Sequence, residues 1–259
     1  MGPVWILQKS LWALNIGASA FVVWRLYVTG LHRTYRFFFA GIIVAIVRSA
    51  ALFPLSPRAK GYYLVWVWTE PLLCLFYILV VFELYALALQ HYRGIYSLSR
   101  WFFFAAVALS AIVSAITVFP TMGGALASRP LLFYYALAER GIVTSLAIFL
   151  LLLLALVAWF PVPLSRNLLT HGSVYTAYFF ASNVIFLSWH IGGSKTSPLS
   201  SIFKLLAALV CFCCWAFFLS REGETRITAL HMGRNSLEEK RLLSQLESLN
   251  ATLLRTIRK

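Results

Sequence analysis

Apolar residues along this chain gather in seven long stretches, and near residue 220 the pattern changes to a polar segment. Each stretch has about the 20 residues that a helix needs to cross the hydrocarbon of a bilayer. We therefore predict seven membrane-spanning helices followed by a helical tail. The predicted spans are residues 11–31, 36–56, 62–90, 101–119, 131–160, 168–190 and 198–219.

The segments between these stretches are short and contain helix-breaking residues such as Pro54, Gly123 and Pro161. None of them is long enough to fold as a soluble catalytic domain. The predicted fold class is all-α, a polytopic membrane protein. It consists of a seven-transmembrane-helix bundle over residues 1–220 and a short C-terminal cytoplasmic helix, amphipathic or coiled-coil, over residues 221–259.

The composition agrees with a membrane location. Hydrophobic residues make up 61% of the 259 positions and charged residues only 12%, whereas soluble domains are roughly 45–50% apolar. The net charge of +14 comes from 22 basic and 8 acidic residues. Basic residues of membrane proteins mark loops and cytoplasmic ends, and no compact basic domain is present to bind nucleic acid. We expect the lipid bilayer as a partner and no nucleic acid.

The distribution of Lys and Arg indicates an orientation. If the tail is cytoplasmic, seven spans place the N-terminus outside. Eight basic residues then lie on the inner side and five on the outer side, the direction that the positive-inside rule requires. We predict an outer N-terminus and a cytoplasmic C-terminus in a bacterial inner (plasma) membrane.

The tail has the sequence of an amphipathic helix. Leu242, Leu246, Leu249 and Leu253 follow one another in the a/d pattern of a coiled coil. Two heptads are too short to pair in isolation. We therefore expect pairing in a homodimer, or with a partner protein, once the membrane region holds two helices together. The alternative is a helix that lies on the inner leaflet.

Seven Glu, Arg and Lys residues fall within the predicted spans and away from their first and last positions, where charges are costly and usually face the interior of a bundle. Because successive spans alternate in direction, the positions of these residues sort them into two layers. The outer layer holds Glu70, Glu139, Arg48, Arg140 and Lys204, and the inner layer holds the predicted pair Arg25 and Glu83.

The outer layer predicts a polar pocket that faces outward and binds a small polar or anionic ligand. Trp66, Trp68, Tyr134 and Tyr135 are expected at its mouth. The alternative is a set of structural ion pairs, with some basic side chains reaching to the interface. The residues assigned to the pocket are Glu70, Glu139, Arg140, Arg48, Trp66 and Trp68.

Three histidines are weak candidates for a metal or haem site. His32, His91 and His171 lie at the inner ends of three predicted spans. Three histidines at one depth could hold a metal ion, and two on facing helices could ligate haem. All three lie near an interface, where His is common, so we predict no metal and no cofactor. The phosphate-loop, nucleophile-elbow and zinc-protease motifs are missing, which favours a non-enzymatic protein.

The overall plan resembles bacterial seven-span sensor modules whose last span continues into a signalling helix. Residues 242–257 are similar to the stalks that precede kinase domains, and the resemblance is confined to this tail. It implies a sensor or scaffold that couples a ligand in the membrane or at the outer face to the cytoplasmic helix. Two alternatives stay open. One is a transporter or channel subunit that uses the intramembrane Glu and Arg residues. The other is a membrane-embedded metal or haem enzyme subunit.

Overall fold

The computed structural model describes residues 3–56, 59–90, 131–159, 164–192, 197–225 and 227–228, with isolated positions at 104, 108 and between 241 and 252. This part of the chain is all-α apart from two short strands, as lipid requires of backbone that must pair internally. The elements are α1 (Pro3–Val28), the 3-10 helix η1 (Leu31–Arg33), α2 (Arg36–Leu52), α3 (Lys60–Ala88), α5 (Leu131–Trp159), β1 (Leu164–Ser165), α6 (Arg166–Gly192), α7 (Ser197–Phe218), α8 (Arg221–Thr225) and β2 (Ile227–Thr228).

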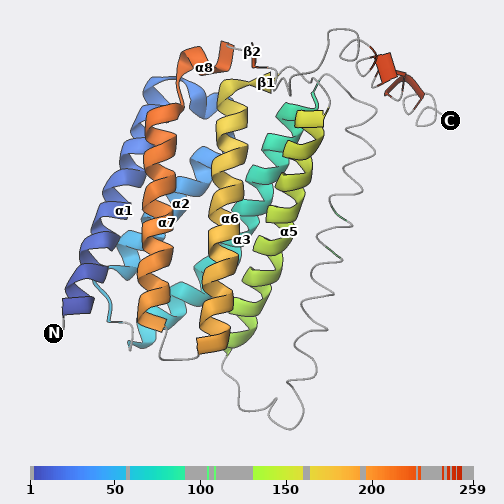
Figure 1. Cartoon of the computed structure of the whole chain (residues 1–259). Coiled ribbons are helices and arrows are strands. Elements are labelled where there is room, and N and C mark those ends of the chain that lie inside the picture. The colour runs from blue at the N-terminus through green and yellow to red at the C-terminus, as the bar shows by residue number, and fades with distance from the viewer. Residues whose placement is uncertain are drawn as a thin grey trace, which may run out of the picture.

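The long helices stand side by side and surround a common interior (Figure 1). Helix α1 packs on α2 and α7, α6 packs on α5 and α7, and α3 packs on α2 and α5, with a smaller contact between α3 and α6. These contacts close a ring in which α5 packs on both α3 and α6. Helix α8 and both strands gather at one end of the bundle, and the N-terminus lies at the other.

The turn from α1 into α2 is fixed by a glycine and by a carboxylate from a neighbouring helix. Gly30 has φ 76°, in the left-handed region that glycine enters without a steric penalty. After η1, the backbone N–H groups of Phe37 and Phe38 donate to the two carboxylate oxygens of Glu83, at 3.1 and 3.3 Å. The first N–H groups of a helix have no partner within it, so Glu83 of α3 caps α2.

The centre of the bundle is packed with aromatic rings. Phe38, Tyr35 and Phe179 are completely buried. The ring of Phe38 lies 4.1 Å from that of His171 and 4.9 Å from that of Trp215, measured between centroids. This cluster joins α2, α6 and α7.

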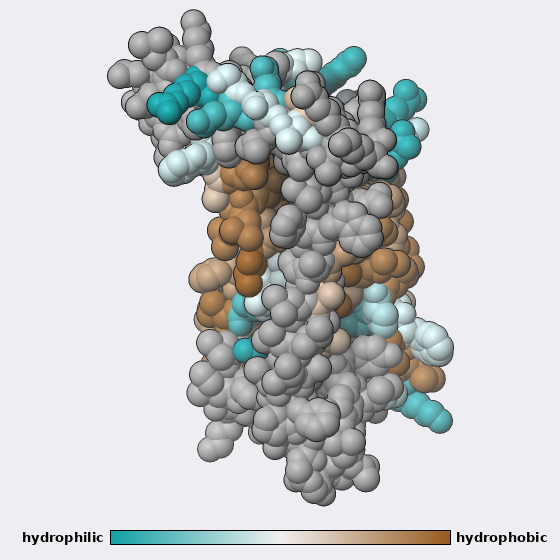
Figure 2. Space-filling model, turned by 90° about the vertical axis from the view of Figure 1, so that its right-hand side faces the viewer, coloured by the Kyte–Doolittle hydropathy of each residue, from teal (hydrophilic) through white to brown (hydrophobic). Residues whose placement is uncertain are grey.

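The outer surface of the bundle is apolar. Trp24, Val47, Leu152, Phe180 and Phe217, each from a different helix, are 59–76% exposed. Figure 2 shows an apolar band across the middle of the molecule, with hydrophilic residues toward its ends. In water such a surface would aggregate, whereas lipid tails cover it. The protein is thus an integral membrane helical protein in contact with the bilayer.

Four described helices are long and apolar enough to cross a membrane, namely Val4–Val28, Lys60–Ala88, Ala138–Trp159 and Leu199–Phe218. The predicted span 36–56 forms α2, whose 17 residues cover about 26 Å at 1.5 Å per residue, short of the roughly 30 Å of hydrocarbon. The predicted span 168–190 forms part of α6, which carries several polar side chains. The predicted span 101–119 lies almost wholly outside the described residues, so seven spans remain a prediction.

The first residues after the predicted domain boundary pack against the bundle. Helix α8 contacts α6 and β1. Strand β2 pairs antiparallel with β1, with Leu164 opposite Thr228 and Ser165 opposite Ile227. Residues 221–225 and 227–228 therefore form a cap on this end of the bundle.

Replacing Phe38 by Ala should lower the unfolding temperature in detergent by several degrees, because loss of a packed Phe side chain costs about 3–5 kcal/mol. Phe37→Ala is the matched control, since Phe37 is 40% exposed and is expected to change the unfolding temperature little. Thermal unfolding followed by tryptophan fluorescence measures both. Equal losses in the two variants would contradict a core centred on Phe38.

Candidate functional site

A polar cavity of about 320 Å³ lies inside the ring of helices. Its walls come mainly from the first halves of α1, α3 and α7 and from the second half of α2, with smaller contributions from α5 and α6. It therefore occupies the end of the bundle opposite to α8. Four charged side chains line it, namely Arg48, Glu70, Glu139 and Lys204.

Arg48 of α2 and Glu70 of α3 form a buried ion pair. The Arg48 Nη2 atom donates to Oε2 of Glu70, and the two side chains are 13% and 6% exposed. The guanidinium also lies 6.0 Å from the centroid of the Trp66 ring, within the range of a cation–π contact. The pair fastens α2 to α3 on the side of the cavity.

Lys204 of α7 and Glu139 of α5 form a second ion pair across the cavity wall. The Lys204 Nζ atom donates to Oε1 of Glu139 at 2.8 Å. The Lys204 side chain is 39% exposed, compared with 7% for Glu139, and the ammonium also lies 5.0 Å from the Phe186 ring of α6. Lys204 is thus the most accessible of the four charged groups.

Asn15 and Gln8 tie α1 to α7 at the same level. The Asn15 amide nitrogen donates to the carbonyl oxygens of Leu11 and Leu205, at 2.9 and 3.0 Å. Its amide oxygen is buried and has no hydrogen-bond partner among the described residues. The Gln8 amide nitrogen donates to the Ser201 hydroxyl at 2.8 Å.

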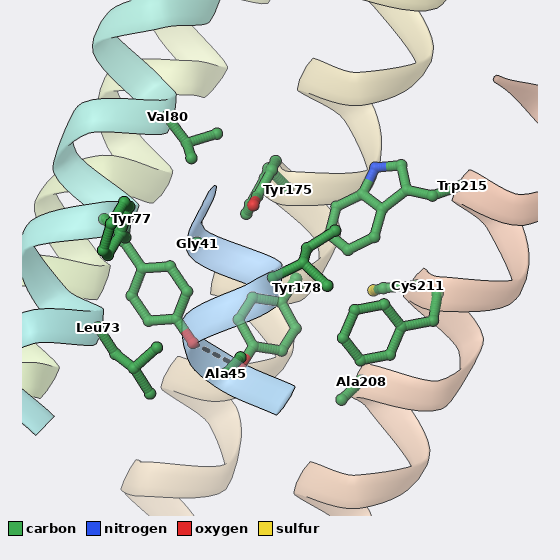
Figure 3. A pocket seen from close by; sticks show the side chains of 13 residues that line it. Gly41, Ala45, Leu73, Tyr77, Val80, Tyr175, Tyr178, Ala208, Cys211 and Trp215 are labelled. Atoms are coloured by element: carbon green, nitrogen blue, oxygen red, sulfur yellow. Dashed lines mark hydrogen bonds between the residues drawn. The ribbon is translucent and has the colours of Figure 1, made fainter. Parts of the chain in front are cut away.

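An aromatic chamber of about 70 Å³ continues the cavity toward the centre of the bundle (Figure 3). The hydroxyls of Tyr77 and Tyr178 lie 3.2 Å apart and share a hydrogen bond at the boundary. Both tyrosines line the polar cavity and the chamber. The chamber is further lined by Gly41, Ala45, Leu73, Val80, Tyr175, Ala208, Cys211, Phe212 and Trp215.

Beyond the chamber, packed rings form a floor around His171. The His171 ring lies 4.1 Å from Phe38, 5.0 Å from Tyr35 and 5.6 Å from Trp215. Neither ring nitrogen of His171 has a hydrogen-bond partner in the described part of the chain, and the indole nitrogen of Trp215 also lacks one.

The other candidate metal ligands are apart from this cluster. His32 stacks on Tyr27 at 5.2 Å in the turn between α1 and α2, and His91 lies outside the described residues. Among the residues described, no group of three or more His, Cys, Asp or Glu side chains is arranged to hold a metal ion. His171 lies instead within an aromatic cluster.

At the α8 end of the bundle, hydrogen bonds hold residues 220–225 to the helices. We call this contact, formed by Tyr35, Asn167, Ser220, Gly223 and Glu224, the junction. The Glu224 carboxylate accepts from the Tyr35 hydroxyl at 2.9 Å and from the Asn167 amide nitrogen at 3.1 Å. Asn167 also donates to the Ser220 carbonyl at 2.7 Å and accepts from the Ser220 N–H at 3.2 Å. Burial of Tyr35, and next the negative charge of Glu224, raise the pKa of Tyr35 well above its ordinary value. The hydroxyl therefore keeps the proton that it donates.

Gly223 allows this junction to close. A Cβ atom at position 223 would overlap the side-chain amide oxygen of Asn167. The Gly223 N–H donates to the Ser220 hydroxyl at 3.0 Å. Residues 221–225 therefore continue from α7 along a path that contacts with the bundle determine.

The structure brings four of the six residues assigned to the pocket to one cavity, and adds Lys204. Arg140 is half-buried on α5 and Trp68 is 78% exposed, and neither lines the cavity. For the inner layer, the Glu83 carboxylate is held by the backbone of α2. No ion pair between Glu83 and Arg25 is present in the described part of the bundle. The four tail leucines lie outside the described residues.

Sequence reasoning did not single out Asn15, Tyr77, Tyr178, Asn167 or Glu224. An Asn inside an apolar run is a usable signal, because an amide in hydrocarbon needs partners. Tyrosine carries little signal, since it is common in membrane helices near the interface. The pairing of Glu224 depends on the path of the chain after α7, which local sequence does not specify.

Comparison of the chain with protein-family models, with curated proteins and with solved structures found no match. The functional conclusion therefore depends on the cavity and the junction alone.

Neutralising one partner of the Arg48–Glu70 pair should destabilise the protein more than neutralising both. Removal of one partner from a buried ion pair costs about 3–5 kcal/mol, because the other charge is left without compensation. We expect Arg48→Gln and Glu70→Gln each to lower the unfolding temperature, and the double variant to recover much of the loss. Thermal unfolding of the four proteins forms a double-mutant cycle.

Lys204→Gln serves as a comparison within the same cavity. Because Lys204 is 39% exposed, we expect a smaller loss of stability than for Arg48→Gln. Additive effects of Arg48→Gln and Glu70→Gln would show that the two residues do not act as a pair.

Proposed function

We propose that this protein is a non-enzymatic membrane sensor or scaffold. In this proposal a seven-span bundle has its N-terminus outside and its C-terminus in the cytoplasm. The cavity binds a small polar or anionic ligand from the membrane or the outer face, and binding changes the position or the pairing of the C-terminal helix.

The junction at Glu224 is the observation that carries the proposal. A tail that served only as a tether would need no specific contact with the bundle. Here Tyr35 and Asn167, both completely buried, bond to Glu224 directly after α7. The segment that leads into the tail is therefore attached to the core of the bundle.

Helix α7 connects the junction to the cavity. It presents Lys204 to the cavity and Trp215 to the aromatic floor, and Ser220 of the junction lies two residues after its end at Phe218. A ligand that contacts Lys204 would favour one position of α7 over another. Such a ligand must bind the two positions with different affinity, since equal affinity shifts no equilibrium.

The tail supplies the output in this proposal. The leucine pattern at 242, 246, 249 and 253 would pair two tails in a homodimer or would bind a partner protein. A change in the position of α7 would move α8, and the movement of α8 would change the distance between the two paired tail helices. No catalytic domain is required of the chain itself.

A transporter is the second candidate, because four charged side chains line a cavity within the membrane region. Ionisable residues at such depth often mark a substrate path. Against it, Phe38, His171, Tyr175 and Trp215 pack ring on ring between the cavity and the α8 end. The described structure therefore supports a binding site with a closed floor better than a path.

Gly223→Ala should loosen the junction without unfolding the bundle. The added methyl group would displace the Asn167 side chain, which would weaken its bonds to Ser220 and Glu224. We expect faster hydrogen exchange in residues 221–228 and unchanged exchange in α1 and α7, measured by mass spectrometry in lipid nanodiscs. Tyr35→Phe, which removes only one hydroxyl, should have the same local effect to a smaller extent.

Gly61→Ala is the matched control, because open space surrounds a Cβ atom at that position. Exchange in residues 221–228 that is unchanged in Gly223→Ala would contradict a specific junction. Faster exchange throughout the bundle would show a general loss of folding, and would count against a separable coupling element.

Labelling with a membrane-impermeant maleimide tests the proposed orientation. A cysteine in place of Ser56, between α2 and α3, should react from outside intact spheroplasts. A cysteine in place of Arg33, between α1 and α2, should react only after permeabilisation. The reverse pattern would invert the topology and place the cavity on the cytoplasmic side.

A further inference from the structure

We infer that the ligand of the cavity is a small amphipathic monoanion, a carboxylic acid with a short apolar end. Its carboxylate would lie against Arg48 and Lys204, and its apolar end would enter the aromatic chamber. The inference deepens the proposed function, because it names the class of ligand for the same cavity.

Unused hydrogen-bond donors point to an anion. A guanidinium has five N–H donors and an ammonium three. Within the described structure, Arg48 uses one donor on Glu70 and Lys204 uses one on Glu139. Donors that remain unpaired within a membrane region are costly, and a carboxylate between the two cations would accept from both.

The charge balance favours a monoanion over a dianion. The cavity holds two basic and two acidic side chains, so its formal charge is zero. A single negative charge adjacent to Arg48 and Lys204 is tolerated, because each cation would lie between the ligand and its own carboxylate partner, Glu70 or Glu139. A phosphate dianion would add a second negative charge next to two carboxylates, which like-charge repulsion disfavours.

The unpartnered oxygen of Asn15 gives the ligand a second polar contact. This side chain lines the cavity and is 7% exposed, and its Oδ1 atom lacks a donor. A buried acceptor without a donor loses its hydrogen bonds to water without replacement, which is unfavourable. A hydroxyl or N–H group on the ligand would satisfy it.

The size of the chamber limits the apolar end. Its volume of about 70 Å³ is smaller than the roughly 150 Å³ of an engineered apolar cavity that binds benzene. The chamber alone therefore takes a branched alkyl group or the leading edge of a ring. The rest of the ligand would occupy the 320 Å³ of the polar cavity. A long acyl chain exceeds this space.

Binding of defined acids to the full chain in lipid nanodiscs tests the inference. The probes are phenylacetate, its neutral counterpart phenylacetamide, and oleate as the long-chain acid that a membrane would supply. Isothermal titration calorimetry reports affinity. We expect phenylacetate to bind at least tenfold more tightly than phenylacetamide, and more tightly than oleate.

Two variants locate the binding site. The double variant Arg48→Gln/Glu70→Gln keeps the formal charge of the cavity and avoids a lone carboxylate, and should weaken phenylacetate binding at least tenfold. Ala208→Leu should weaken it by filling the boundary that the chamber shares with the cavity. Arg140→Gln and Ala207→Leu are the matched controls, because neither residue lines the two cavities, and both should bind as the parent does.

Equal affinity for phenylacetate and phenylacetamide would overturn the inference, as would unchanged binding in the double variant. Binding of oleate without any binding of the short acid would overturn the assignment of a small ligand. Failure of the proposed function has a different readout. If phenylacetate binds as expected but leaves hydrogen exchange in residues 221–228 unchanged, the ligand class stands and the sensor proposal fails.

Discussion

Lipid offers no hydrogen bonds, and this constraint governs where the polar groups of the bundle lie. Each carboxylate of the cavity contacts a basic side chain, and Glu83 accepts from two backbone amides. Hydroxyls follow the same rule, since Thr144 and Thr176 donate to carbonyl oxygens one turn earlier in their own helices. Among the residues that the structure describes, the few buried side-chain polar atoms left without partners lie on Asn15, His32, His171 and Trp215. Three of these four side chains line the cavity, the chamber or the floor between the cavity and the junction.

Two helices, α6 and α7, connect the cavity to the junction. Helix α6 carries Tyr178 at the cavity and Asn167 at the junction, while α7 spans between Lys204 and Ser220. The space between them is filled by rings from three helices in mutual contact. Interiors packed in this way resist gradual deformation and move as rigid units. In the proposed function, this packing would transmit a displacement of α7 at the cavity to α8.

The sequence predicts the depth of the charged groups in the membrane better than the side of the helix on which they lie. The length and alternation of the spans place Arg48, Glu70, Glu139 and Lys204 at one level, and the structure joins them in two pairs. The rotation of each helix about its axis is not predicted, because a span that is apolar on every side has no amphipathic pattern to show which side faces the interior. For that reason the sequence predicts Trp68 at the pocket although it faces outward, and it does not predict the backbone partners of Glu83. The all-α class followed directly from the apolar stretches.

The two ion pairs of the cavity differ in how far apart their members lie in the sequence, and so in the time between their syntheses. Arg48 precedes Glu70 by 22 residues, so α2 and α3 can pack together as a hairpin whose charges already match. Glu139 precedes Lys204 by 65 residues, with α6 between them. During insertion, α5 therefore carries an acid whose partner has not yet been made. Assembly of the bundle is complete only when α7 arrives, and a chain that stalls before this helix would present an unmatched acid within the bilayer to the quality-control machinery of the membrane.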